Sequence, residues 1–271
     1  MASRPVPVEG GAHESYARLR RDAWILAAIA VGLWIVLRIF LGAMPQWASY
    51  HDFADTRTRF GIPRAGDVLT NLAILAAGLW GWSIGPRAHL CADERPAFVL
   101  LVGATILTAL GSANYHLAPT NPTLVWDRLP MALVMVALLM LLAADRIDGR
   151  HARAALAPLV VLGVAGVAWW GVTEALGHGD LLLYGVVRIG TMVMLAVLLL
   201  LWPGRTRGDA WLWASFVVAI AMMVVERFDR EIYDATGRVV SGHNLKHVLA
   251  GVVIACMFGW LRFRRPRDGA P

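Results

Sequence analysis

The chain has 271 residues, 58% of them hydrophobic, and a mean hydropathy of +0.58, which is typical of a membrane protein with several spans and excludes an ordinary soluble domain. Its net charge of +6 does not indicate nucleic-acid binding, because the basic residues lie in short loops between apolar runs. The two cysteines, Cys91 and Cys256, are expected at different membrane levels, so no disulfide is predicted.

Eight apolar runs are long enough to cross a bilayer, which takes about 17 to 25 helical residues. Backbone groups in hydrocarbon must be satisfied within their own segment, so these runs are predicted as helices, and they are too continuous for barrel strands. The sequence therefore predicts an all-α polytopic membrane protein. The predicted spans are residues 24–41, 67–85, 97–116, 124–144, 154–173, 181–202, 210–228 and 242–261.

The distribution of basic residues predicts the orientation of these spans. Arginine and lysine are more frequent in the tails and loops on the N-terminal side than on the opposite side, which places both termini in the cytoplasm of a multi-pass inner-membrane protein. Odd-numbered spans then end, and even-numbered spans begin, on the non-cytoplasmic side. Five polar residues near such ends are therefore expected at one membrane face: Ser112, His116, Asp127, His243 and His247.

Three histidines at one level predict a metal site. His243 and His247 are four residues apart, so a helix places both rings on one face. Zinc would take these two rings and His116 at roughly 2.0 to 2.1 Å and leave its fourth position for water. Each motif alone has an ordinary explanation, such as helix packing or an interfacial ion pair between Asp127 and Arg128. Their occurrence at one face favours the metal.

The neighbouring polar residues suit hydrolysis. Asp127 is the predicted catalytic base and then acid for a metal-activated water, and the Ser112 hydroxyl could bind that water or the developing oxyanion. Trp126 is expected to line the substrate pocket beside Asp127. Lys246, the only lysine, could contact a phosphate or carboxylate headgroup, or it could extend to the membrane interface.

At these residues the sequence resembles the alkaline ceramidase family, within the superfamily of seven-helix membrane hydrolases that includes progestin and adiponectin receptors. The resemblance rests on S-x3-H (Ser112, His116), an Asp eleven residues later (Asp127) and a terminal H-x3-H (His243, His247), and it covers about residues 50–261. It implies zinc on His116, His243 and His247 and hydrolysis of the N-acyl amide of a ceramide-like membrane lipid to a fatty acid and an amine.

The resemblance also implies a division of the chain. Residues 1–22 would be a cytoplasmic tail, 23–66 an additional N-terminal transmembrane helix and loop, 67–262 the seven-helix hydrolase core, and 263–271 a basic tail. Animal relatives carry an acidic calcium-binding segment before the core. Here the matching stretch keeps Asp52 and Asp55 but contains three arginines, so internal Asp–Arg pairs are expected there and no calcium.

Two other functions fit the same scaffold in principle. A receptor or sensor would use the metal structurally, and it would have no need of a free acid such as Asp127 beside an open coordination site. A transporter would be expected to show broken helices at mid-depth or internal repeats, and neither is evident in the sequence. An ion pair between Arg188 and Glu226 is expected to join two spans. The sequence does not indicate the oligomeric state.

Overall fold

The computed structural model describes residues 9–267, with only the backbone for residues 9–15, and most of this chain is helical. Within the described residues, eight helical stretches are long and apolar enough to cross a membrane, which is consistent with a multi-pass membrane protein. They are α1 (Glu9–Leu41), α2 (Ala65–Thr70) joined to α3 (Leu72–Ile84), α4 (Arg95–Leu117), α5 (Asn121–Arg146), α6 (Gly149–Ala175), α7 (Leu182–Leu201), α8 (Asp209–Arg227) and α10 (Gly242–Phe263).

Short elements complete the described chain. They are α9 (Asp229–Ala235), the 3-10 turns η1 (Ala48–His51) and η2 (Gly85–Arg87), and the antiparallel strands β1 (Thr206–Arg207) and β2 (Arg265–Pro266). The predicted tails are shorter than expected: residues 9–22 belong to α1, and residues 265–266 pair with β1. Residues 1–8 and 268–271 of those tails lie outside the described part.

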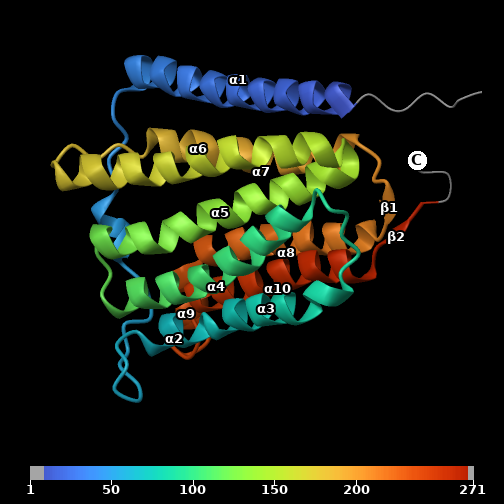
Figure 1. Cartoon of the computed structure of the whole chain (residues 1–271). Coiled ribbons are helices and arrows are strands. Elements are labelled where there is room, and N and C mark those ends of the chain that lie inside the picture. The colour runs from blue at the N-terminus through green and yellow to red at the C-terminus, as the bar shows by residue number, and fades with distance from the viewer. Residues whose placement is uncertain (1–8, 268–271) are drawn as a thin grey trace, which may run out of the picture.

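The helices form a layered bundle with α5 at its centre (Figure 1). α5 packs against α4, α6 and α7, while α10 packs against α3 and α8. The main core is apolar and includes the fully buried Leu101, Leu141, Phe258 and Trp260. α1 lies on the outside of the bundle against α6 and α7 (Figure 1).

Capping residues set the starts of the two helices that carry most of the predicted site. Thr120 and Thr123 form a capping box at the start of α5, and Ser241 and Asn244 form one at the start of α10. Each box satisfies backbone N–H groups that the first helical turn leaves without partners. The starts of α5 and α10 lie at the same end of the bundle as the end of α4 (Figure 1).

Candidate metal centre

Three buried imidazoles meet at this end of the bundle. His116 is in the last turn of α4, and His243 and His247 are in the first turns of α10. One ring nitrogen from each lies within 4.8 Å of the others, and Nε2 of His116 is 3.2 Å from Nε2 of His243. Two nitrogens on one tetrahedral zinc would be roughly 3.3 Å apart, given the usual zinc–nitrogen bond length. The predicted convergence of the three rings is confirmed, and their donor set fits zinc.

Thr70 orients the ring of His247. The Thr70 hydroxyl lies 2.8 Å from the carbonyl oxygen of Gly66, to which it donates, and 3.0 Å from Nδ1 of His247. Because the hydroxyl proton is used by the carbonyl, the hydroxyl oxygen accepts from Nδ1–H of the imidazole. This tautomer leaves the Nε2 lone pair of His247 free for an ion, as in metal sites where the second ring nitrogen has its own partner.

Asp67 lies beside the ring of His116. Oδ2 of Asp67 is 4.0 Å from Nδ1 of His116, and neither of these buried atoms has a hydrogen-bond partner in the described chain. Oδ1 of Asp67 accepts a 2.6 Å hydrogen bond from the side-chain amide of Asn244, which lies between the two histidines of α10. A small approach of Asp67 would give His116 the carboxylate partner that metal-binding imidazoles usually have.

Asp229 and Gly242 fix the start of α10 against the preceding helices. The Asp229 carboxylate accepts from the backbone N–H of His243 at 2.7 Å and from that of Ala54 at 3.0 Å. A Cβ atom at Gly242 would lie 2.0 Å from the carbonyl oxygen of Val225, so only glycine allows this approach. The Asp229 carboxylate therefore holds the backbone both at His243, a predicted metal ligand, and at Ala54, in the segment before α2.

Phe53, in that segment, covers the histidines. Its ring centre is 4.7 Å from that of His116 and 4.5 Å from that of His243, and the side chain is buried. Tyr115 also contacts Phe53 and His116, at 5.9 and 4.9 Å between ring centres. Aromatic rings thus separate one side of the imidazole cluster from solvent.

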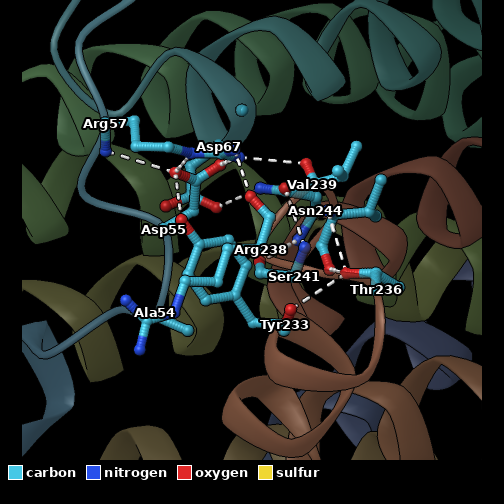
Figure 2. Close-up of polar contacts among 12 residues, drawn as sticks. Ala54, Asp55, Arg57, Asp67, Tyr233, Thr236, Arg238, Val239, Ser241 and Asn244 are labelled. Atoms are coloured by element: carbon cyan, nitrogen blue, oxygen red, sulfur yellow. Dashed lines mark hydrogen bonds and ion pairs between the residues drawn. The ribbon is translucent and has the colours of Figure 1, made fainter.

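Asp55 and Arg57 tie the same segment to the loop before α10 (Figure 2). The two side chains form a 2.7 Å ion pair, as the Asp–Arg content of the segment predicted. The Arg57 guanidinium also donates to the carbonyl oxygens of Arg238 and Val239. Burial alone would raise the pKa of Asp55, but hydrogen bonds from Arg57 and its charge outweigh burial and lower that pKa below the ordinary value of 3.8.

Ser112 and Asp127 are buried where α4 and α5 cross. A Cβ atom at Gly111 would lie 2.2 Å from the carbonyl oxygen of Trp126, so the two helices touch directly beside both residues. Oδ1 of Asp127 is buried and has no hydrogen-bond partner in the described chain. Trp126 is 62% exposed and lies on the outside of the bundle, so its assignment to a pocket wall stays a prediction.

The ion pairs around α7 and α8 differ from the expected ones. Glu226 pairs with Lys246, at 2.6 Å between Oε1 and Nζ, whereas Arg188 donates to the hydroxyl of Tyr184 at 3.1 Å. Lys246 is nearer in space because it lies on α10, which packs along α8, the helix of Glu226. Its contact with a substrate headgroup stays a prediction.

The sequence analysis missed the residues that support the histidines. Asp67 was taken only as the start of a span, and Thr70, Phe53 and Asn244 were given no role in the site. The signal that could have found two of them is position. Asp67 and Asn244 are polar residues within the first turns of predicted spans, at the same predicted membrane level as the histidines.

The comparisons with known proteins identify no relatives. No protein-family model matches the chain, and no curated protein or solved structure matches it.

Proposed function

We propose that this protein is a membrane-embedded, metal-dependent amidohydrolase that cleaves the N-acyl amide of ceramide-like lipids to a fatty acid and an amine. The observation that carries the proposal is the convergence of His116, His243 and His247 in a buried site. Structural zinc sites usually have four protein ligands, whereas catalytic sites have three. Three described residues form this group, and all three are neutral donors suited to zinc.

The metal and the residues around it have separate roles in the proposed reaction. Zinc, held by the three imidazoles, would supply the Lewis acidity that polarises an amide carbonyl and makes water nucleophilic near neutral pH. Asp127 takes the proton that the water loses and transfers it to the amide nitrogen as the C–N bond breaks. Ser112 donates a hydrogen bond to the charge that develops on the carbonyl oxygen. The products are a free fatty acid and the amine of the lipid.

The arrangement of the helices supports a lipid as the substrate. The histidines lie within the first or last turns of apolar helices, at the level where the amide of an N-acyl lipid would lie if these helices span a bilayer. In this proposal the termini are cytoplasmic and the site faces the non-cytoplasmic side of the membrane. A receptor with a structural metal is the alternative, and it does not require Asp127.

The test separates metal binding from turnover. Detergent-purified protein is analysed for bound metals and incubated with a panel of N-acyl lipids, and released fatty acid is measured. Asp127→Asn should retain the metal but lose turnover by a factor of about 100 or more, because it cannot accept the proton. His243→Ala should lose both. Asp234→Asn, at a 69% exposed carboxylate, serves as the control and should change neither.

Full turnover in Asp127→Asn would exclude the assigned proton transfer. Bound metal without turnover on any N-acyl lipid by the native protein would favour the receptor.

A further inference from the structure

Two arginines near Asp127 form no ion pair with a carboxylate among the described residues. Arg128 is 5% exposed, and its Nε and Nη1 atoms have no hydrogen-bond partner in the described chain. Its one described side-chain hydrogen bond, from Nη2, goes to the neutral side chain of Gln46 at 2.6 Å. A buried guanidinium without a counter-charge is costly, so an anion at this position would be strongly stabilising.

Aromatic rings hold Arg128 in place without giving its Nε and Nη1 atoms a hydrogen-bond partner. The guanidinium carbon lies 4.4 Å from the ring centre of Trp170, 5.0 Å from that of Tyr50 and 5.3 Å from that of Tyr184. Such contacts stabilise a cation without neutralising it. The position of the charge is therefore set before any ligand arrives.

Arg188 lies on the same tyrosine. Its guanidinium carbon is 5.9 Å from the Tyr184 ring centre, and its Nη1 donates to the Tyr184 hydroxyl. No carboxylate among the described residues forms an ion pair with it, and its side chain is exposed on α7 within an apolar stretch. A cation at such a place in a membrane helix is costly and marks a ligand pathway more often than a packing contact.

Lys246 and Asp127 complete the charge balance of this region. Asp127 lies within electrostatic range of Lys246, Arg128 and Arg188. Lys246 is already paired with Glu226. Arg128 and Arg188 form no ion pair with Asp127 or Glu226 in the described chain, so they remain the two cations without a carboxylate in direct contact. Both lie within electrostatic range of the residue proposed to carry the proton.

We propose that Arg128 and Arg188 form an oxyanion-binding subsite for a phosphate on the polar end of the lipid substrate. This inference rests on the proposed function, because it names the substrate of the same site. The planar guanidinium presents paired N–H donors that match phosphate oxygens. N-acyl lipids bearing phosphate should therefore be preferred over neutral ceramide.

Binding can be measured without turnover. Protein in a neutral maltoside detergent is treated with a chelator, so that phosphate has no metal to bind, and titrated with hexadecyl phosphate, hexadecanol or inorganic phosphate. Hexadecyl phosphate should bind at least about tenfold more tightly than hexadecanol, as expected for a charge-assisted contact. Binding by inorganic phosphate alone at similar affinity would assign the subsite to free phosphate instead of a lipid headgroup and overturn the proposal.

Variants that remove a single positive charge show which arginine binds the phosphate. Arg188→Gln should weaken hexadecyl phosphate binding roughly tenfold and leave hexadecanol binding unchanged. Arg150→Gln removes the same charge from an exposed position at the start of α6 and should leave both affinities unchanged. Arg128→Gln should weaken binding further, although Arg188→Gln alone decides the matter if that buried variant does not fold.

Equal affinity for hexadecyl phosphate and hexadecanol, or an unchanged affinity in Arg188→Gln, would overturn the subsite. Its failure is distinguishable from failure of the proposed function. Selective phosphate binding without amide hydrolysis would leave the subsite standing and remove the hydrolase. Hydrolysis of neutral and phosphorylated lipids at equal rates, with no selective binding, would support the hydrolase and exclude the phosphate subsite.

Discussion

Thr70 determines which nitrogen of His247 faces the other two histidines. Its hydroxyl can accept only from Nδ1–H, because its own proton goes to Gly66. Without that partner the ring would lose one of the contacts that fix its orientation and the position of its proton. Metal binding would then have to reorder the ring, at the expense of affinity.

Thr70→Val should therefore weaken metal binding by about 10- to 100-fold while the fold is retained. The measurement is competition for zinc with a chromophoric chelator. Thr105→Val is the matched control, since the Thr105 hydroxyl is fully buried and bonds only to a carbonyl of its own helix, that of Leu101. Equal zinc affinity in the native protein and Thr70→Val would show that packing alone orients His247.

At this scale the sequence predicted the ligands and not their supports. Spacing and membrane level were enough to group His116, His243 and His247, because both follow from helix geometry. The partners of those rings depend on which helices are neighbours. Asp67 reaches His116 because α2 packs against both α4 and α10, and no local pattern in the sequence specifies that.

Among the elements, α1 is the one least enclosed by the rest of the bundle. It packs on α6 and α7, and its side chains are largely exposed. One buried carboxylate anchors its end: Asp180 is 1% exposed and pairs with Arg38 at 2.9 Å. Asp180 also accepts from the backbone N–H groups of Met44 and Leu182, so it joins the chain after α1 to the start of α7.

Arg38→Gln should loosen α1 without disturbing the core. The Arg38 side chain is 40% exposed, so the pair is expected to contribute about 1 kcal/mol, equivalent to roughly fivefold faster local opening. Hydrogen exchange measured by mass spectrometry should speed up near Arg38 and stay unchanged in α5. Arg21→Gln, which breaks the exposed Arg21–Asp22 pair of the same helix, is the control. Unchanged exchange near Arg38 would mean that apolar packing alone holds α1.

Element positions were predicted better than contacts between elements. The eight apolar stretches were found from length and hydropathy, since a membrane span needs little information beyond these. The predicted ion pair between Glu226 and Arg188 was wrong. Glu226 pairs with Lys246 instead, because α10, which carries Lys246, packs along α8. The interruption at Asn71 between α2 and α3 also carried no clear sequence signal.

At the scale of the whole molecule, the Asp55–Arg57 ion pair makes the stability of the fold at acid pH depend on one contact. That contact holds two segments together at the end of the bundle where the histidines lie. The pKa of Asp55 is lower in the folded state than its ordinary value. A group with a lowered pKa stabilises the fold above its unfolded pKa, and this contribution is lost as the pH falls through the folded pKa. The pair joins the segment before α2 to the loop before α10, so its loss should open that end first.

Asp55→Asn should therefore lower the Tm by an amount that depends on pH. The difference between native protein and variant should be constant above about pH 5 and shrink below about pH 4, as the Asp55 carboxylate is protonated first in the unfolded and then, at lower pH, in the folded native protein. Loss of metal at low pH affects both proteins and cancels in the comparison. Asp234→Asn, at an exposed carboxylate, should follow the native curve throughout. A difference undiminished down to about pH 2 would mean that the charge of Asp55 is irrelevant to stability.

The ring of Phe53 over His116 and His243 has a consequence for how a metal ion would reach the site. An ion arriving from bulk water past Phe53 would have to shed most of its hydration shell before it met all three nitrogens, because the aromatic ring offers no oxygen or nitrogen to replace the lost waters. Exchange of the ion in the folded protein should be slow. Occupancy would then record which metals were present while the chain was folding, and later changes in their concentration would have little influence on it.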